Sequence, residues 1–459
     1  MRTPQHRSAA AQRTVFMPWV LPAMLALVAA GVMLSGRDLS QMYAELAAGG
    51  NGSYNPAMDW LQRGVSVLLL LASGERILRH FGSGRPLPSV PLVASYSVYW
   101  VATVAFTAVL GAHPSVGHEY AYSLVIGFAM MLTTGEELPA ILQRARDALF
   151  VLMVVSVALI PVDPSMVLDA SYTQGLLPGV PRLGGVAPHP VALGMFAQTG
   201  LLLLCAYPYR SRPVNLLAWG LGLGVLFFAQ SKTAWIAFVL CSACLLLVRG
   251  GARAWQRLGD PRDNSFGILA CLGAMLVGAG LLVLLVFDDV GDKIASFFDT
   301  QEGAQLMSLT GRDQIWAVAW EEWHAHPWFG YGPTLWDEDF RNAIAMPNAT
   351  SAHNQFMDTL ARSGTVGAIA LVVYAAVLLW LSLRHARDTR GLSIALFIAL
   401  ALRSVSEVPL LLFGYGSELF IHLLLVVTLA AGAAQRRGLA AAPAGRRGSR
   451  VARPLRRPA

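Results

Sequence analysis

The sequence predicts an all-α polytopic membrane protein, and three observations lead to this class. The 459 residues are 55% hydrophobic, only 13% of them are charged, and the mean hydropathy is +0.52. Soluble domains carry about 25% charged residues, so this composition excludes a soluble globular protein, a disordered chain and a coiled coil. The apolar residues occur in long unbroken runs, whereas the strands of a membrane barrel alternate between apolar and polar residues. α-Helices are therefore the remaining structure that can satisfy the hydrogen bonds of the backbone inside lipid.

The apolar runs divide into about twelve candidate spans, because crossing a bilayer requires about 20 apolar residues. The predicted spans are 15–35, 58–74, 88–111, 118–134, 147–163, 191–208, 213–229, 232–248, 266–287, 364–383, 391–409 and 412–432. Every link on the side of the N-terminus is basic: 75–87, 135–146, 209–212, 249–265, 384–390 and the tail. Because basic links stay in the cytoplasm, we expect both termini there, which requires an even number of spans.

These spans define five predicted regions. They are a cytoplasmic N-terminus (1–14), helices 1–9 (15–287), a periplasmic cap loop (288–363), helices 10–12 (364–432) and a basic cytoplasmic tail (433–459). From Gln435 onwards the tail holds eight Arg and no acidic residue, and its Ala, Arg, Pro and Gly composition is typical of disorder. We interpret its charge as a cytoplasmic retention signal and expect no nucleic-acid partner.

The cap loop between the ninth and tenth spans is the largest segment outside the predicted membrane. Residues 288–362 hold twelve acidic residues against four basic ones, and five of the twelve Trp lie among them. The pattern predicts a helix over 310–324 that ends before Pro327, a turn at 330–333, and a helix over 351–362 that breaks at Ser363-Gly364. We therefore expect a small ordered cap on the outer face.

The position of this cap distinguishes an enzyme from a transporter. A typical twelve-span transporter has two six-span halves joined by a long central link. Here the link after the sixth span, 209–212, has only about four residues, and the bulk lies outside after the ninth span. A large external cap over a helical bundle favours an enzyme that acts on a lipid-anchored substrate at the outer leaflet.

The most specific motif lies where the cap loop enters the tenth span. His353-Asn354 is followed, after nine residues, by Gly364-Thr365-Val366-Gly367. Three further stretches accompany it: Thr310-Gly311-Arg312 with Trp316 and then Pro327 to Gly332, Ser231-Lys232-Thr233, and Arg182-Leu183 with Gly185, His189 and Leu193-Gly194. Together, over about residues 180–410, these motifs resemble the O-antigen ligase and polysaccharide polymerase superfamily. The Thr-Gly-Arg and Gly-x-Gly stretches look most like its exopolysaccharide polymerase branch.

The resemblance implies an activity, a location and a set of partners. It implies an inverting transfer of a glycan from undecaprenyl diphosphate to an acceptor sugar hydroxyl, on a C-type glycosyltransferase architecture, without a metal or other cofactor. The site would face the periplasm from the inner membrane of a Gram-negative bacterium. The implied partners are the lipid-linked glycan, an acceptor glycan or lipid A core, and as candidates a chain-length regulator and a flippase. We favour an O-antigen or exopolysaccharide polymerase; the alternatives are an O-antigen ligase, a protein O-oligosaccharyltransferase, and a polytopic transporter or flippase.

The resemblance also implies roles for particular residues. His353 and Arg312 are the predicted catalytic residues, and Arg182, Lys232, Asn354 and Arg341 are the predicted substrate-binding residues. A neutral imidazole can take the proton of the acceptor hydroxyl, so His353 would be the general base. Cations must meet the charge of the departing diphosphate, and they are scarce on the outer side. We therefore expect Arg182, Lys232 and Arg312 to converge at the outer membrane boundary.

Each of these assignments has a simpler alternative. His353 could fasten the loop to the bundle, Lys232 could be an interfacial anchor, and Arg312 could pair with a loop acid. Lys232 stands where the family usually has Arg, which replaces a bidentate group by a point charge. Val191 replaces the usual Asn after His189, so the role of His189 stays open.

Three further sets of polar residues have simpler expected roles. Arg403 and Glu407, four residues apart in the eleventh span, are expected to form a mutual ion pair. Arg362 is expected to pair with a loop acid. His324 and His326 lack the spacing of a zinc site, so no metal is expected.

Overall fold

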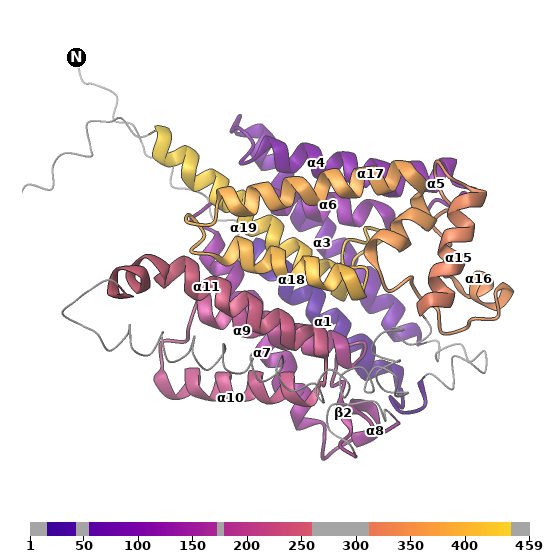
Figure 1. Cartoon of the computed structure of the whole chain (residues 1–459), viewed down its shortest axis with the longest axis horizontal. Helices are drawn as coiled ribbons and strands as arrows, with labels where there is room; N and C mark the ends of the chain where they lie inside the picture. Colours follow the sequence, from indigo (N-terminus) through magenta and orange to yellow (C-terminus); the bar gives the residue numbers. More distant parts are fainter. Residues whose placement is uncertain (1–15, 43–54, 172–178, 259–311, 442–459) are drawn as a thin grey trace, which may run out of the picture.

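The structure is a computed structural model that describes residues 16–42, 55–171, 179–258 and 312–441. Its helices are α1 (Met17–Ser35), α3 (Pro56–Gly82), α4 (Val90–Trp100), the π-helix η1 (Val101–Ala105), α5 (Phe106–Leu110), α6 (Tyr120–Met131), α7 (Leu138–Ala158), α8 (Pro164–Val167), α9 (Pro190–Ala206), α10 (Arg212–Phe228), α11 (Lys232–Leu258), α15 (Arg312–Ala325), α16 (Glu338–Ala343), α17 (Gln355–Arg384), α18 (Leu392–Ser406) and α19 (Ser417–Ala441). Two short strands, β1 (Leu168–Asp169) and β2 (Arg182–Leu183), pair antiparallel. The predicted all-α class is confirmed (Figure 1).

Five helical segments are long and apolar enough to cross a membrane. They are Met17–Ser35, Val90–Leu110, Lys232–Gly250, Gln355–Arg384 and Ser417–Gly438. Shorter apolar helices lie beside them: Tyr120–Met131, Pro190–Ala206, Arg212–Phe228 and Leu392–Ser406. The predicted span 266–287 and the first part of the cap loop lie outside the described residues, whereas each of the other eleven predicted spans overlaps a helix. The chain is a multi-pass helical protein, and the count of twelve spans stays a prediction.

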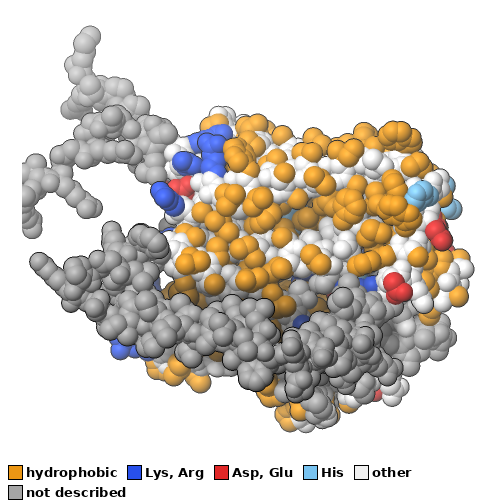
Figure 2. All heavy atoms as spheres, in the orientation of Figure 1, with side chains coloured by type: hydrophobic (Ala, Val, Ile, Leu, Met, Phe, Trp, Pro, Cys, Tyr) orange, Lys and Arg blue, Asp and Glu red, His pale blue; other side chains and the backbone are white. Residues whose placement is uncertain are grey.

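The basic links come together at one end of the helical bundle. Arg437 donates to the carbonyl of Leu87, and Arg436 donates to the carbonyl of Arg384 at the end of α17. A hollow between α3 and α19 is lined by Arg76, Arg79, Arg85 and Arg437. Figure 2 shows most of the visible Lys and Arg side chains gathered at this end, most of the visible Asp and Glu toward the opposite end, and hydrophobic side chains between them. Where the structure describes them, the links that the charge pattern assigns to one side of a membrane therefore share one end of the bundle.

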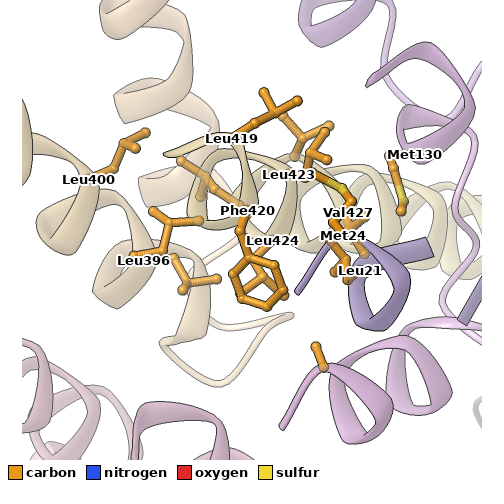
Figure 3. Packing of buried hydrophobic residues seen from close by; sticks show 14 of the residues in the cluster. Leu21, Met24, Met130, Leu396, Leu400, Leu419, Phe420, Leu423, Leu424 and Val427 are labelled. Atoms are coloured by element: carbon orange, nitrogen blue, oxygen red, sulfur yellow. The ribbon is translucent and has the colours of Figure 1, made fainter. Parts of the chain in front are cut away.

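Helix α19 forms the centre of the bundle. Its residues Leu419, Phe420, Leu423, Leu424 and Val427 are almost fully buried. Figure 3 shows them beside Leu21 and Met24 of α1, Leu396 and Leu400 of α18, and Met130 of α6. A helix that is apolar on every side must be surrounded by protein or lipid. The buried α19 thus sets where the preceding α18–α19 connection lies, and that connection carries part of the candidate site.

The cap lies against a break in α17, beyond the end of the bundle at which α17 begins (Figure 1). The break is at Gly364, where φ is +64° and ψ is −165°, as the sequence predicts. A Cβ atom at Gly364 would clash with the backbone of Trp328, and one at Gly330 with the carbonyl of Arg362. These close approaches allow Tyr331 to donate to the Ala361 carbonyl (2.9 Å) and Thr365 to the Pro327 carbonyl (2.8 Å). The motif glycines thus hold the cap against the bundle.

The two predicted cap helices are present with shifted bounds. The first, predicted over 310–324, is α15, whose described residues run from Arg312 to Ala325. The second, predicted from residue 351, begins only at Gln355, because Asn354 is the N-cap. Residues 351–354 therefore form a loop rather than a helical turn, and this loop carries His353.

Candidate functional site

His353 lies in the loop that leads into α17, and Asn354 fixes this loop. The Asn354 Oδ1 atom accepts hydrogen bonds from the backbone N–H groups of Phe356 (3.0 Å) and Met357 (3.1 Å). Its Nδ2 atom donates to the carbonyl of Val405 on α18 (3.3 Å). His353 itself has a φ of +45°, a conformation rare for a residue with a side chain and often found at functional sites. The structure thus places Asn354 as a positioning residue, and its predicted contact with substrate stays a prediction.

The cap helix α15 is attached directly next to His353. Trp316 Nε1 donates to the carbonyl of Ala352 (2.9 Å), and the Ala352 N–H donates to Asp358 (3.2 Å). Asp358 also forms an ion pair with Arg362 (3.1 Å), so the predicted pairing of Arg362 with a loop acid is confirmed. Arg312 lies about one helical turn before Trp316 on α15. The predicted catalytic cation therefore stands at the helix end that contacts the His353 loop.

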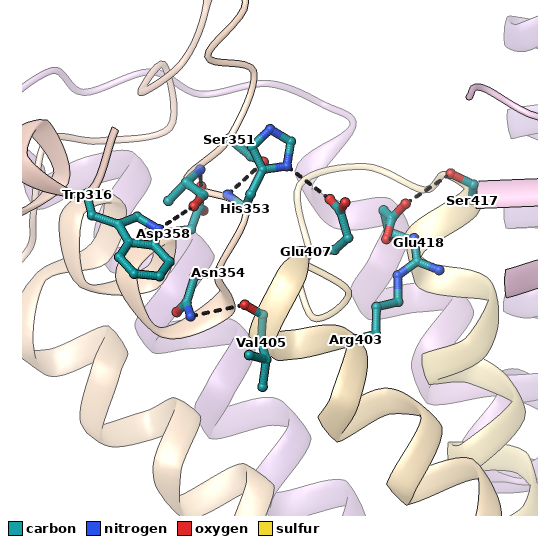
Figure 4. A network of polar contacts seen from close by, with 11 residues as sticks. Trp316, Ser351, His353, Asn354, Asp358, Arg403, Val405, Glu407, Ser417 and Glu418 are labelled. Carbon is teal, nitrogen blue, oxygen red and sulfur yellow. Dashed lines mark hydrogen bonds and ion pairs between the residues drawn. The ribbon is translucent and has the colours of Figure 1, made fainter. Parts of the chain in front are cut away.

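His353 contacts the carboxylate of Glu407, which the sequence analysis expected to pair with Arg403. Its Nδ1 atom lies 3.2 Å from Oε2 of Glu407, as Figure 4 shows. Arg403 instead pairs with Glu418 at the start of α19. The predicted Arg403–Glu407 ion pair is therefore wrong. Helix α18 ends at Ser406, and Glu407 has an extended backbone (φ −150°, ψ −177°), so its side chain leaves the helical row that a four-residue spacing would require.

His189 belongs to the same cluster. It is the N-cap residue of α9, and the charges of Glu407, Arg403, Arg182 and His353 all act on its ring. The pKa of His189 is lowered to about 4, chiefly because the ring is buried; the cations Arg403 and Arg182 add to the lowering, and Glu407 opposes it. His189 is therefore neutral near pH 7 and adds no cation to the site. The sequence left its role open because its motif is incomplete.

Two of the predicted diphosphate-binding cations lie on neighbouring segments. Arg182 is buried in β2, and its Nε atom donates to the carbonyl of Ala229 at the end of α10 (3.3 Å). Gln230 Nε2 donates to the carbonyl of Val180 (3.0 Å), which fastens the same two segments. Lys232, three residues after Ala229, is the first residue of α11 and its side chain is exposed. These two hydrogen bonds hold the start of α11, and with it the backbone of Lys232, close to the strand that carries Arg182.

The fourth predicted outer cation, Arg341, has contacts within the cap. It lies on α16, where its Nη1 atom donates to the carbonyl of Pro347 (2.7 Å) and its Nε atom to the carbonyl of Asp337 (3.2 Å). These bonds close the loop that follows α16. Its predicted role in substrate binding stays a prediction.

Sequence reasoning missed Arg37, which holds the loop between β2 and α9. Its guanidinium donates to the carbonyls of Gly185 (2.8 Å), Met166 (3.3 Å) and Pro188. Because Pro188 directly precedes His189, Arg37 fixes the entry of that residue into the site. A single Arg directly after the first span, on the side poor in cations, is the signal that could have identified it.

The described helices and this cluster define a multi-pass helical membrane protein with a polar site at one end of its bundle. Residues 217–372 match the family model described as O-Antigen ligase. The chain therefore carries an O-antigen ligase family domain, and the resemblance to the O-antigen ligase and polymerase superfamily is confirmed. The matched range includes Lys232, Arg312, Arg341, His353 and Asn354, whereas Arg182, Arg403 and Glu407 lie outside it. A search of curated proteins found no match.

No group of three or more His, Cys, Asp or Glu side chains within the described part of the chain is arranged to hold a metal ion. In particular, His324 lies on α15, where its Nδ1 atom contacts the carbonyl of Trp320 (2.9 Å). His353, Glu407 and His189 form a cluster of acid–base groups, on which the cations Arg182 and Arg403 act.

Proposed function

We propose that this protein is a glycosyltransferase that moves a glycan from a polyprenyl diphosphate, undecaprenyl diphosphate, to a sugar hydroxyl. We further propose that it acts as an O-antigen or exopolysaccharide polymerase at the periplasmic face of a Gram-negative inner membrane. The observation that carries the proposal is the contact between His353 and Glu407, beside His189, on which Arg182 and Arg403 also act. His353 lies inside the segment that matches the O-antigen ligase family. A base and cations side by side suit a transfer in which a hydroxyl loses a proton while an anion departs.

The proposed step is a single displacement at the anomeric carbon of the donor sugar. The acceptor hydroxyl oxygen forms the new bond to that carbon, and its proton moves to the Nε2 atom of His353. The bond between the anomeric carbon and the diphosphate oxygen breaks, and its electron pair leaves with the diphosphate. Arg312, Arg182 and Lys232 balance the charge on this leaving group; an Arg can bind two oxygens at once and Lys acts as a point charge.

An apolar groove beside the site supports a lipid-linked donor. It has a volume of about 480 Å³ and lies between Trp320 and Trp323 of α15 and Phe356, Leu360 and Ile369 of α17. Phe356 is two residues from Asn354, so the groove starts next to the His353 loop and follows the membrane-spanning part of α17. A polyprenyl chain in this groove would bury apolar surface while its diphosphate reached the polar end.

Reconstitution with a purified lipid-linked repeat unit tests the proposal. A polymerase would convert the donor into a ladder of longer lipid-linked glycans, measured on a gel and by mass spectrometry of the released chains. Transport of the donor between leaflets with no new glycosidic bond would overturn the proposal and favour the flippase alternative.

An O-antigen ligase is the second candidate, because the matched family model carries that description. The same reconstitution with lipid A core as acceptor separates the two activities. Attachment of a single preformed glycan to lipid A core, without chain growth, would identify a ligase. Attachment to a protein hydroxyl would identify an O-oligosaccharyltransferase.

A further inference from the structure

Glu407 is a carboxylate that faces His353 from the end of α18. Its Oε2 atom lies 3.2 Å from Nδ1 of His353, and the two side chains are 13% and 28% exposed. An ionised carboxylate can only accept hydrogen bonds, so the ring nitrogen that faces it carries a proton. In a neutral imidazole the other nitrogen, Nε2, then holds the free lone pair.

We propose that Glu407 is a positioning residue that prepares His353 for proton transfer. The inference rests on the proposed role of His353 as the general base. Glu407 keeps the His353 proton on Nδ1, which leaves Nε2 free to accept the proton of the acceptor hydroxyl. Once Nε2 has taken that proton, the ring is a cation, and the Glu407 carboxylate stabilises it. Glu407 itself touches neither the donor nor the acceptor.

The backbone around Glu407 is fastened to the backbone around His353 on both sides. Before Glu407, the Val405 carbonyl accepts a hydrogen bond from Asn354 (3.3 Å). After it, the Leu410 N–H donates to the side chain of Gln355 (2.7 Å). The partners Asn354 and Gln355 directly follow His353 in the chain. These bonds hold the carboxylate and the imidazole in one geometry before any substrate binds, which is what a positioning role requires.

The surrounding charges keep Glu407 available to His353. Arg403 of α18, which could have neutralised it, pairs with Glu418 of α19. The hydrogen bond with His353 favours the ionised form of the Glu407 carboxylate, and the Arg403 guanidinium acts on it in the same sense. Arg182 of β2 also acts on the nearby His189 ring, so cations approach the cluster from two elements.

The test compares Glu407→Gln and Glu407→Asp in the reconstituted full-length protein with a lipid-linked glycan donor. Glu407→Gln should lower kcat by about 10²-fold, with the KM of the donor unchanged, since loss of base function costs about 10²–10⁴-fold. The acidic limb of its kcat/KM profile should move to lower pH, because nothing then stabilises the imidazolium. Glu407→Asp, which keeps the charge, should keep the wild-type limb and lose less kcat. Glu75→Gln, in a partly exposed ion pair with Arg79 at the basic end, should match wild type.

Each outcome either supports or contradicts the positioning role of Glu407. Loss of kcat in Glu407→Gln with an unmoved acidic limb, or wild-type kcat in that variant, would overturn the positioning role while leaving His353 as the base. Wild-type transfer by His353→Ala would instead overturn the proposed base itself. The double variant should be no slower than His353→Ala, because a positioning residue has no effect once the residue it positions is gone. An additional loss would give Glu407 a role independent of His353.

Discussion

The two ends of the bundle use charge in different ways. At the basic end, guanidinium groups bind backbone carbonyls at helix ends and in the turns beside them. Arg436 binds the carbonyl of Arg384 at the end of α17, and Arg249 binds those of Cys205 near the end of α9 (2.8 Å) and of Arg390 in the turn before α18 (3.0 Å). Cations near helix C-termini complement the helix dipole and can stay exposed. The largely buried ion pair there, Arg76 with Glu137 (2.6 Å), is joined to neighbouring backbone: Arg76 also donates to the Leu132 carbonyl (2.7 Å) and the Thr134 N–H donates to Glu137 (3.0 Å).

At the opposite end, ionisable groups from several elements face one another. His353 precedes α17, Glu407 follows α18, His189 precedes α9, and Arg182 lies in β2. Bringing such groups out of water costs free energy that simple packing would avoid. Charge at the basic end can therefore be explained by helix ends and membrane sidedness. The clustered charges at the other end are instead explained by a functional site.

The sidedness of the two ends gives the largest expected difference. We predict that a Cys placed at Ser308 in a background without native Cys is labelled from the periplasm by a membrane-impermeant reagent. A Cys placed at Ser83, beside the Arg-lined hollow of the basic end, should be labelled only after the inner membrane is permeabilised. The opposite pattern would invert the topology and remove the proposed periplasmic transfer.

Loss of the base gives the next largest effect. His353→Ala should reduce glycan transfer by about 10²–10⁴-fold, because the acceptor hydroxyl then lacks its proton acceptor. The measurement is glycan chain length on a gel, in a deletion strain that carries each variant at matched expression. His324→Ala and His326→Ala are the matched controls and should be far milder. An equal loss in His326→Ala would point to a structural role for the whole cap.

Removal of an exposed cation at the site end should have a smaller but clear effect. Lys232→Ala should lose most of the transfer activity, since a charge near the departing diphosphate is lost. Lys232→Arg should keep activity, because the cation remains. Both are measured as initial rates with the lipid-linked donor. Normal product from a stably expressed Lys232→Ala protein would identify Lys232 as an interfacial anchor instead.

The contact between cap and bundle can be weakened without touching the acid–base groups. Gly364→Ala introduces a Cβ atom at a φ of +64° and against the Trp328 backbone, so it should destabilise the protein by about 1–3 kcal/mol. Gly220→Ala, in α10 where nothing lies within 4 Å of the added atom, is the matched control. The control should be neutral or slightly stabilising, since Ala is favoured over Gly in helices. Thermal unfolding in detergent measures both; equal midpoints would refute the tight contact.

The smallest effect is expected at the basic end. Arg249 is exposed and binds only backbone carbonyls among its described contacts, so Arg249→Gln should change stability by less than about 1 kcal/mol and leave transfer unchanged. Thermal unfolding and the transfer rate check this together. A transfer defect as large as that of Lys232→Ala would end the functional distinction between the two ends.

Sequence reasoning reached the helical class, the break at Gly364, the pairing of Arg362 and the region of His353. Hydropathy, helix-breaking residues and a motif with fixed spacing depend only on residues that are close together in the chain, so they can be recognised from the sequence. It misplaced the start of α17 by four residues, since Ser351 and Asn354 are both good N-cap residues and the contact with Val405 selects Asn354. It also missed Arg37, whose partners lie more than a hundred residues away in the chain.

The amino-acid sequence by itself determined that this protein is a bundle of apolar helices with its basic links at one end, because composition and charge pattern act locally. Only the tertiary structure decided which ionisable groups meet at the other end. Glu407 pairs with His353, 54 positions away, and Arg403 pairs with Glu418. The physical reason is the point at which α18 ends: one further helical turn would have aligned Arg403 with Glu407, and the extended backbone at Glu407 directs that carboxylate to the imidazole instead.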